Sequence, residues 1–428
     1  MANKMKVAII GCGARGKDVY AKIQYKIPDK MEIVAAVDFD SKKLEEMQLE
    51  YNIPEEMCFT DANEFLSLEK VADVVFLCTL DKMHYEYAIK AMKKGYHLLL
   101  EKPISPYIKE CIEIEQVAKQ YNRHVVVCHV LRYTPFYTKV KELIESGVAG
   151  DVVAVQAIEP VGYWHQAHSF IRGNWRNSEE TSPMILQKCC HDMDILLWLC
   201  GKKCKKVSSF GSLRLFKKEN APEGAPERCT DGCPASETCP YYAPRYYITQ
   251  VRCGNVEWPI NLLNSHPTEE NIMDALRNGP YGRCVYHCDN NVVDHQVVNL
   301  ELEDGATVNF TMCGFTKDSY RRLCIMGTHG EIVGDMENNT IIIKPFVGEN
   351  QIIDVNTLAD DFSGHGGGDV QMVKDLADLL IDGSVKNNRI SSIEHSMESH
   401  YVAFAAEESR VCGGKLIELD NFVTQNSK

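Results

Sequence analysis

Near its N-terminus the chain reads Val7-Ala8-Ile9-Ile10-Gly11-Cys12-Gly13-Ala14-Arg15-Gly16, an apolar run that breaks into the pattern G-x-G-x-x-G. An apolar run followed at once by this pattern predicts a buried strand, a tight turn and a helix. Gly11 permits the turn, Gly13 lets the backbone approach a pyrophosphate, and Gly16 lets the helix lie close to the strand. The amides of Ala14 and Arg15 are expected at the helix N-terminus, facing the phosphates. The stretch therefore predicts a dinucleotide site.

A second apolar run, from Ile33 to Val37, ends at Asp38. Its distance from the glycines is close to the spacing of about 20 residues at which this kind of site places a carboxylate for the ribose hydroxyls. A carboxylate there repels a 2′-phosphate, because the two charges have the same sign. Asp38 therefore favours NAD over NADP as the cofactor.

Strand and helix patterns alternate from Asp38 to the strand 124–130. Buried strands are expected at 74–79 and 98–100, and helices at about 41–51, 82–94 and 107–121. Such alternation is typical of a parallel sheet with helices on both faces. We expect residues 1–130 to form a Rossmann domain, a doubly wound α/β fold.

The composition is that of an acidic globular protein: hydrophobic residues make up 45% of the 428 residues, charged residues make up 25%, and the formal net charge is −14. This charge disfavours nucleic acids and anionic membranes as partners, so the expected ligand is a small molecule. No apolar run has the length needed to span a bilayer, and the first strand leaves no room for a cleavable signal. We expect a cytoplasmic protein.

Several segments resemble the Gfo/Idh/MocA family of NAD(P)-dependent oxidoreductases, which includes glucose-fructose oxidoreductase and inositol dehydrogenases. They are Gly11-Cys12-Gly13 with Arg15-Gly16, Cys78-Thr79 with His84, Gly95-Tyr96-His97 with Glu101-Lys102-Pro103, and Leu131-Arg132-Tyr133. The resemblance implies a C-terminal α/β domain over residues 131–428, built on a large, mostly antiparallel open sheet whose exposed face often carries homo-oligomer contacts. It also implies cofactor contacts from Thr79, His84, Glu101, Lys102 and Arg132. Leu80 departs from the family, which usually has a proline there.

Glu101-Lys102-Pro103 follows the apolar strand 98–100 directly. Ligands of open α/β sheets bind beyond the carboxyl ends of the strands, and a charged pair at that place is hard to explain by packing. We expect Lys102 to face the ligand and to act in catalysis.

The second domain opens with a strand pattern at 151–161 and a loop from Tyr163 to Arg176 that is rich in aromatic and polar side chains. Aromatic faces pack on the C–H face of a polyhydroxylated ring, and polar groups meet its hydroxyls. The loop is therefore a candidate substrate site; the alternatives are a rigid structural loop or a subunit contact. The candidate residues are Tyr163, Trp164, His165, His168, Arg172, Trp175 and Arg176.

A mostly apolar helix is expected over 183–199, and it carries Gln187, Lys188 and His191 close together on its surface. In the resembled family, this helix supplies an Asp and, four residues later, a His, which both contact the reacting hydroxyl. His191 matches that His, whereas Gln187 stands where the Asp is expected. Because Gln cannot take a proton, Lys188 or a residue of the Tyr163 loop is expected to share the catalytic role.

From about 217 to 291 the chain loses clear periodicity and reads as a Cys-rich insertion. Cys229, Cys233 and Cys239 are candidate ligands for a structural zinc or an iron–sulfur cluster, with free thiols or a redox clip as alternatives. Further along, Ser363-Gly364-His365-Gly366-Gly367-Gly368-Asp369 precedes a helix at about 370–381, and its glycines let His365 approach a substrate.

Taken together, these patterns predict an NAD-dependent dehydrogenase that oxidises a secondary hydroxyl of a sugar, a glycoside (for example at C3 of a pyranoside) or a cyclitol. Two alternatives stay open. One is a redox-neutral, NAD-dependent enzyme that cleaves glycosides by transient oxidation and elimination. The other is a non-catalytic NAD-binding regulator.

Overall fold

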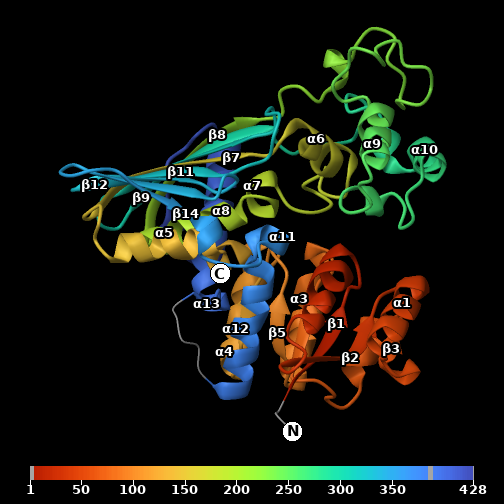
Figure 1. Ribbon diagram of the computed structural model, residues 1–428, viewed down its shortest axis with the longest axis horizontal. Coiled ribbons are helices and arrows are strands. Elements are labelled where there is room, and N and C mark those ends of the chain that lie inside the picture. Colours follow the sequence, from red (N-terminus) through yellow and green to blue (C-terminus); the bar gives the residue numbers. More distant parts are fainter. Residues whose placement is uncertain (1–3, 384–388, 428) are drawn as a thin grey trace.

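The computed structural model describes residues 4–383 and 389–427, and two sheets organise them (Figure 1). The first sheet has six parallel strands in the order β3-β2-β1-β4-β5-β6. Its strands are β1 (Met5–Ile10), β2 (Met31–Val37), β3 (Cys58–Phe59), β4 (Val74–Leu77), β5 (His97–Leu100) and β6 (Val125–Val127). From β1 the chain adds strands on one side, and from β4 it adds them on the other side. Sheets of this kind bind ligands beyond the carboxyl ends of the two strands where this order switches, β1 and β4. The predicted Rossmann fold is confirmed.

Three helices of this part lie where the sequence predicts them, at about 41–51, 82–94 and 107–121, and a fourth, short helix was not expected. They are α1 (Ser41–Tyr51), α2 (Ala62–Ser67), α3 (Asp81–Lys94) and α4 (Ile108–Gln120). Asp40 caps α1 by accepting a hydrogen bond from the Lys42 amide, and Asp61 caps α2 in the same way. α3 ends at Gly95, whose φ of +102° lies in the left-handed region that glycine adopts readily.

The second sheet has nine strands in the order β14-β13-β12-β11-β7-β10-β9-β8-β15. Only β7 and β10 are parallel neighbours, so the predicted, mostly antiparallel sheet is confirmed. Its strands are β7 (Val152–Pro160), β8 (Cys204–Ser212), β9 (His295–Leu302), β10 (Thr307–Cys313), β11 (Arg322–Gly327), β12 (Gly330–Asp335), β13 (Thr340–Pro345), β14 (Gln351–Asp354) and β15 (Ile417–Glu418). The helices α5 (Pro135–Glu145), α8 (Cys190–Cys200) and α13 (Ile393–Val411) share its core.

One helix from the C-terminal half of the chain belongs to the core of the first sheet. α12 (Gly368–Asp382) follows the short α11 (Ser363–Gly366), and its residues Val370, Met372 and Val373 share a core with Val7 and Ile9 of β1. The span 131–428 that the sequence assigns to the second domain therefore includes a helix that packs on the first. The remaining C-terminal helix is α14 (Leu419–Asn426).

Two local predictions are wrong. The helix expected over 183–199 is broken into α7 (Met184–Gln187) and α8, and the break places the Lys188 ammonium 3.2 Å from the Glu159 carboxylate of β7. The stretch expected as a loop from Tyr163 is helical, with α6 (Tyr163–His165) followed by the π-helix η5 (Gln166–Arg172). All seven residues of η5 are buried.

The predicted insertion lies at the end of the second sheet, beside α6 (Figure 1, green). It contains α9 (Ala243–Arg252), the short η7 (Ile260–Leu262) and α10 (Glu269–Asn278), which pack around a core of their own. Tyr247 and Leu276 are fully buried there. Over the described ranges, no helix is long and apolar enough to cross a membrane.

Candidate active site

The turn after β1 has the steric features of a dinucleotide cradle. Gly11 has φ of +95°, and a Cβ atom there would lie 2.7 Å from the Cys78 carbonyl carbon. A Cβ at Gly16 would lie 2.0 Å from the carbonyl oxygen of Gly11, whereas at Gly13 nothing lies within 4 Å. Close backbone contacts thus require two of the glycines, and the third leaves space for a pyrophosphate. After it, Ala14 and Arg15 begin the helix η1 (Ala14–Tyr20), so the residues present fit NAD.

Asp38 lies at the end of β2 with its carboxylate held in place. Its Oδ2 accepts a hydrogen bond from the Cys12 amide at 2.8 Å, and its Oδ1 accepts one from the Asp40 amide at 3.0 Å. The Lys43 ammonium lies 3.7 Å from Oδ1. The carboxylate is thus positioned beside the glycine turn, and a cation that sequence reasoning missed stands next to it.

Arg15 links the cofactor turn to the ends of two other elements. Its guanidinium contacts the Glu101 carboxylate at 2.6 Å, the Asp369 carboxylate of α12 at 2.7 Å and the Tyr20 hydroxyl at 2.5 Å. Burial alone would raise the pKa values of Glu101 and Asp369, but Arg15 outweighs it and both are lowered. Arg15 and Glu101 therefore form an ion pair next to the glycine turn.

Lys102 and His191 come together although Lys102 follows β5 of the first sheet and His191 lies in α8, which packs on the second sheet. The Lys102 ammonium donates to the backbone carbonyl of Gln187 at 2.7 Å, and the nearby Lys102 cation lowers the pKa of His191. The side-chain Oε1 of Gln187 and the Nδ1 of His191 are buried, and neither has a hydrogen-bond partner among the described residues. Buried polar atoms without partners are costly, so these two mark a place where a ligand would supply the missing bonds.

His191 is neutral at physiological pH. Burial lowers its pKa well below the usual value of histidine, and the Lys102 cation adds to this. Its ring centroid lies 5.9 Å from that of His129 and 6.0 Å from that of His365. A neutral ring has one nitrogen that accepts a hydrogen bond or a proton.

A buried charge cluster that sequence reasoning missed lies beside this pair. Glu159, at the end of β7, contacts Lys188 at 3.2 Å and Arg321 at 2.9 Å, and Arg321 also contacts Asp192 at 2.8 Å. Burial raises the pKa of Glu159, although both cations oppose the effect. Only the charge of Glu159 at the end of an apolar strand could have indicated this cluster from the sequence, because Lys188 and Arg321 lie far from Glu159 along the chain.

Three residues predicted to contact the cofactor differ in whether their polar side-chain atoms already have hydrogen-bond partners within the protein. Arg132 is buried, and two of its nitrogens donate to Asp194 at 2.6 and 2.5 Å, which joins the chain before α5 to α8. His84 has its ring nitrogens 2.9 Å from the Pro103 carbonyl and 3.0 Å from the Thr79 carbonyl. The Thr79 hydroxyl is buried and unpartnered within the described ranges. Thr79 thus has a polar side-chain atom without a partner in the described part of the chain, and the cofactor contacts of Arg132 and His84 stay predictions.

Aromatic rings from the predicted substrate stretch meet rings of the insertion. Trp164 is stacked on His165, with centroids 5.4 Å apart, and on Tyr246 of α9 at 5.9 Å. His168 is stacked on Tyr281 at 4.5 Å, and its Nδ1 lies 2.7 Å from the Tyr247 hydroxyl. Tyr163 meets Tyr241 at 6.1 Å. Much of this ring surface is used within the protein.

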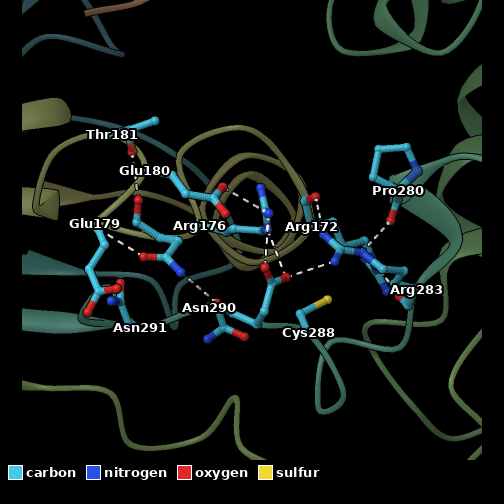
Figure 2. Close-up of polar contacts among 12 residues, drawn as sticks. Arg172, Arg176, Glu179, Glu180, Thr181, Pro280, Arg283, Cys288, Asn290 and Asn291 are labelled. Carbon is cyan, nitrogen blue, oxygen red and sulfur yellow. Dashed lines mark hydrogen bonds and ion pairs between the residues drawn. The ribbon is translucent and has the colours of Figure 1, made fainter. Parts of the chain in front are cut away.

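The two arginines of the stretch join it to the insertion. Arg172 donates to the carbonyls of Arg283 at 2.7 Å and Tyr241 at 2.6 Å. Arg176 contacts Asp289, which also accepts from Arg283 at 2.8 Å (Figure 2). Both arginines thus have their donors engaged, as the alternative of a rigid structural segment predicts. Trp175 is partly buried against the core of the second sheet.

His365 lies in the glycine-rich turn before α12 with a left-handed φ of +32°. Its Nδ1 lies 3.0 Å from the Asp369 carboxylate and 3.5 Å from the Arg15 guanidinium. Its side chain is 41% exposed, and its ring centroid lies 6.0 Å from that of His191. The turn thus brings His365 from a distant part of the sequence to the predicted site.

The metal hypothesis for the insertion is not supported. Residues 4–383 and 389–427 contain no group of three or more His, Cys, Asp or Glu side chains arranged to hold a metal ion. Cys229, Cys233 and Cys239 are free thiols, and Cys229 accepts a weak contact from Arg172 at 3.7 Å. The spacing of the cysteines along the chain was a misleading signal, because the fold does not converge them on one point.

Models of one protein family match two consecutive parts of the chain. Residues 5–129 match the oxidoreductase family with an NAD-binding Rossmann fold, and residues 141–410 match the C-terminal alpha/beta domain of the same family. This chain belongs to the Gfo/Idh/MocA family. The resemblance seen in the sequence is confirmed, and the protein is an oxidoreductase with an NAD-binding domain.

Similar proteins are distant in sequence. The protein YteT of Bacillus subtilis (strain 168) is 23% identical over 390 residues, which cover 86% of this chain and 88% of YteT. Inositol 2-dehydrogenase of Corynebacterium glutamicum (strain R) is 24% identical over 48% of this chain and 57% of that enzyme. The structure of an oxidoreductase from Agrobacterium radiobacter in complex with NAD+, L-tartaric acid and magnesium has a TM-score of 0.69 at 15% identity, covering 98% of this chain and 99% of that chain. The structural likeness shows that the fold is shared.

Proposed function

We propose that this oxidoreductase uses NAD to oxidise a secondary hydroxyl of a sugar, a glycoside or a cyclitol to a ketone. The observation that carries the proposal is the meeting of Lys102 with His191 beside buried polar atoms that lack partners. The name of the relative inositol 2-dehydrogenase supports the substrate class. A polyol would satisfy several such atoms at once, which a simple aliphatic alcohol would not.

In the proposed reaction, the substrate hydroxyl lies between Lys102 and His191. The Lys102 ammonium, held by the Gln187 carbonyl at 2.7 Å, donates to the hydroxyl oxygen and stabilises the negative charge that develops on it. Neutral His191 takes up the hydroxyl proton at its unpartnered nitrogen. The bound nicotinamide supplies the acceptor for the hydride that leaves the carbon.

Lys188 and Glu159 are proposed to complete the proton path. The resembled family has a carboxylate where this chain has Gln187, and Glu159 places a carboxylate beside the site from another strand. Its pKa is raised by burial, so Glu159 is better suited to exchange a proton than an exposed carboxylate. We also propose that His365 contacts the substrate. We further propose that the protein is a cytoplasmic homo-oligomer.

A substrate screen tests the proposal. Purified protein is mixed with NAD and a panel of methyl pyranosides, phenyl pyranosides and cyclitols. NADH formation is measured by its absorbance, and NMR locates the carbonyl group of the product. NADH release with one class of polyol, and its loss in Lys102→Ala, is the expected result. Sugar cleavage without net NADH would instead support the redox-neutral alternative. NAD binding without turnover of any polyol would contradict the proposal and favour a regulator.

A further inference from the structure

The insertion places one more aromatic ring beside the substrate stretch. Trp258, between α9 and η7, has its ring centroid 4.9 Å from His165, 5.6 Å from His168 and 5.7 Å from Trp164. The interplanar angles are 74°, 83° and 58°, so none of these rings is stacked on Trp258. The residue is 39% exposed. Trp258 thus differs from Trp164, whose ring is already stacked on His165 and on Tyr246.

Polar groups without partners surround this ring. Among the described residues, the indole N–H groups of Trp164 and Trp258 have no acceptor, and the ring nitrogens of His165 have no partner. Burial, together with the Lys188 cation, lowers the pKa of His165 well below its usual value, so its neutral ring offers one donor and one acceptor. A partly exposed aromatic surface next to free donors and acceptors suits a ring that carries hydroxyls.

The position of Trp258 relates it to the reacting centre. His165 is close enough to Lys188 and Lys102 for both cations to lower its pKa. Trp258 contacts His165 edge to face. Asn261, three residues after Trp258, donates to the Asp18 carboxylate of η1 at 3.4 Å. The segment that carries Trp258 therefore reaches from the substrate stretch to the helix that follows the glycine turn.

The insertion is held firmly enough for this ring to be a defined surface. Arg283 donates to the Arg172 carbonyl at 2.9 Å and contacts Asp289, which also contacts Arg176 (Figure 2). Cys284 donates its amide to the Glu227 carbonyl at 2.9 Å, within the insertion. The bond from Arg283 to the Arg172 carbonyl fixes the insertion to η5, the same helix that carries His168.

We propose that Trp258 forms an outer carbohydrate subsite, which binds a second cyclic unit attached to the ring that is oxidised. This inference rests on the proposed function and narrows its substrate class to glycosides with a further sugar ring or an aromatic aglycone. The reacting ring lies at Lys102 and His191, and the second ring lies against Trp258 and beside His165. A cyclitol or a methyl glycoside leaves the outer subsite empty.

The test compares methyl and phenyl pyranosides of the same sugar, in the glucose, galactose, mannose and rhamnose configurations. For the configuration that the wild type oxidises, kcat/KM is measured with Trp258→Leu, which keeps bulk but removes the flat ring, and with Trp258→Phe, which keeps a ring. Val256→Ala, at an exposed apolar residue of the same segment, is the matched control. Circular dichroism and thermal unfolding verify that each variant is folded.

Trp258→Leu is expected to lower kcat/KM on the phenyl glycoside by at least about tenfold, mainly through KM, and to change it less than about twofold on the methyl glycoside. Trp258→Phe should restore most of the loss, and Val256→Ala should match the wild type. Equal effects of Trp258→Leu on both glycosides, or no effect on either, would overturn the subsite while leaving the proposed function intact. If the wild type oxidises cyclitols alone, the subsite is overturned and dehydrogenation stands; if it oxidises no polyol, both fail.

Discussion

Arg172 and Arg283 exchange hydrogen bonds between their guanidinium groups and backbone carbonyls. Arg172 Nε donates to the Arg283 carbonyl at 2.7 Å, and Arg283 Nη2 donates to the Arg172 carbonyl at 2.9 Å. The pair joins η5 of the second domain to the Cys-rich insertion. Arg172 is only 3% exposed and also donates to the Tyr241 carbonyl at 2.6 Å, so the loss of its side chain would leave two backbone carbonyls without these donors.

Arg172→Ala is therefore expected to lower the free energy of unfolding by about 2–6 kcal/mol, since the carbonyls of Arg283 and Tyr241 lose their donors at about 1–3 kcal/mol each. Chemical unfolding in urea measures this difference. Arg176→Ala is the matched control: its partner Asp289 is 51% exposed, so we expect a loss of about 1 kcal/mol or less. Equal losses of unfolding free energy in the two variants would show that the hydrogen bonds between Arg172 and Arg283 do not stabilise the protein more than the exposed ion pair of Arg176 does.

Lys102→Ala and His191→Ala are each expected to lower kcat by roughly 10²–10⁴ and to change NAD affinity only a few-fold, because both act on the hydroxyl and its proton. Steady-state kinetics on the substrate found by the screen, with NAD titration by protein fluorescence, measures both effects. Gln187→Ala should cost less, since the backbone carbonyl of Gln187, and not its side chain, holds Lys102. Near-normal turnover in both main variants would show that the reaction takes place elsewhere.

Asp38 is expected to make NAD the preferred cofactor, by about 1–3 kcal/mol or roughly tenfold to hundredfold in affinity. Asp38→Asn keeps an acceptor for the Cys12 amide and removes the charge, so it should narrow the preference mainly by improving NADP binding. Lys43→Ala should widen the preference for NAD, because the Lys43 ammonium 3.7 Å from Asp38 is a cation that would attract a 2′-phosphate. Calorimetric titration with both cofactors decides this, and equal or tighter NADP binding by the wild type would refute it.

His400 is expected to make the protein acid-sensitive. It is fully buried, its Nε2 accepts from the Ile104 amide at 3.0 Å, and burial together with His129 lowers its pKa to about 3. In the unfolded chain the value is about 6.5, so the stabilisation by neutral His400 is fully present above about pH 6.5 and is lost as the pH falls toward 3.

His400→Gln retains a donor and an acceptor but does not titrate. Between about pH 6 and 4, the free energy of unfolding should therefore fall less steeply in this variant, by about 1.4 kcal/mol per pH unit, whatever its stability at pH 7. Urea unfolding at several pH values measures the slope. His395→Gln, at an exposed residue of the same helix, serves as the control and should keep the wild-type slope. An unchanged slope in His400→Gln would contradict the prediction.

Short stretches of sequence determined much of the first domain. The alternation of apolar strands and helices predicted its parallel sheet. The glycine pattern predicted a turn that binds a dinucleotide, and the steric surroundings of Gly11, Gly13 and Gly16 agree with such a turn. These features depend on residues that are neighbours in the chain, where turn geometry, capping and steric contact act locally. The position of Lys102 after β5 followed from the same reasoning, because parallel strands end at one edge of the sheet.

Tertiary structure alone decided which distant side chains share a site. Glu159 meets Lys188 and Arg321 because the break after α7 turns Lys188 toward the end of β7, and no periodic pattern encodes that break. Trp258 reaches His165 only because the insertion folds around its own core and is fixed to η5 by Arg172 and Arg283. Long-range contacts depend on strand register and on how separate cores pack, so residue spacing could suggest a metal site at the cysteines that the fold does not form. The sequence by itself determined the cofactor turn and the sheet edge, and the packing of the chain decided what surrounds them.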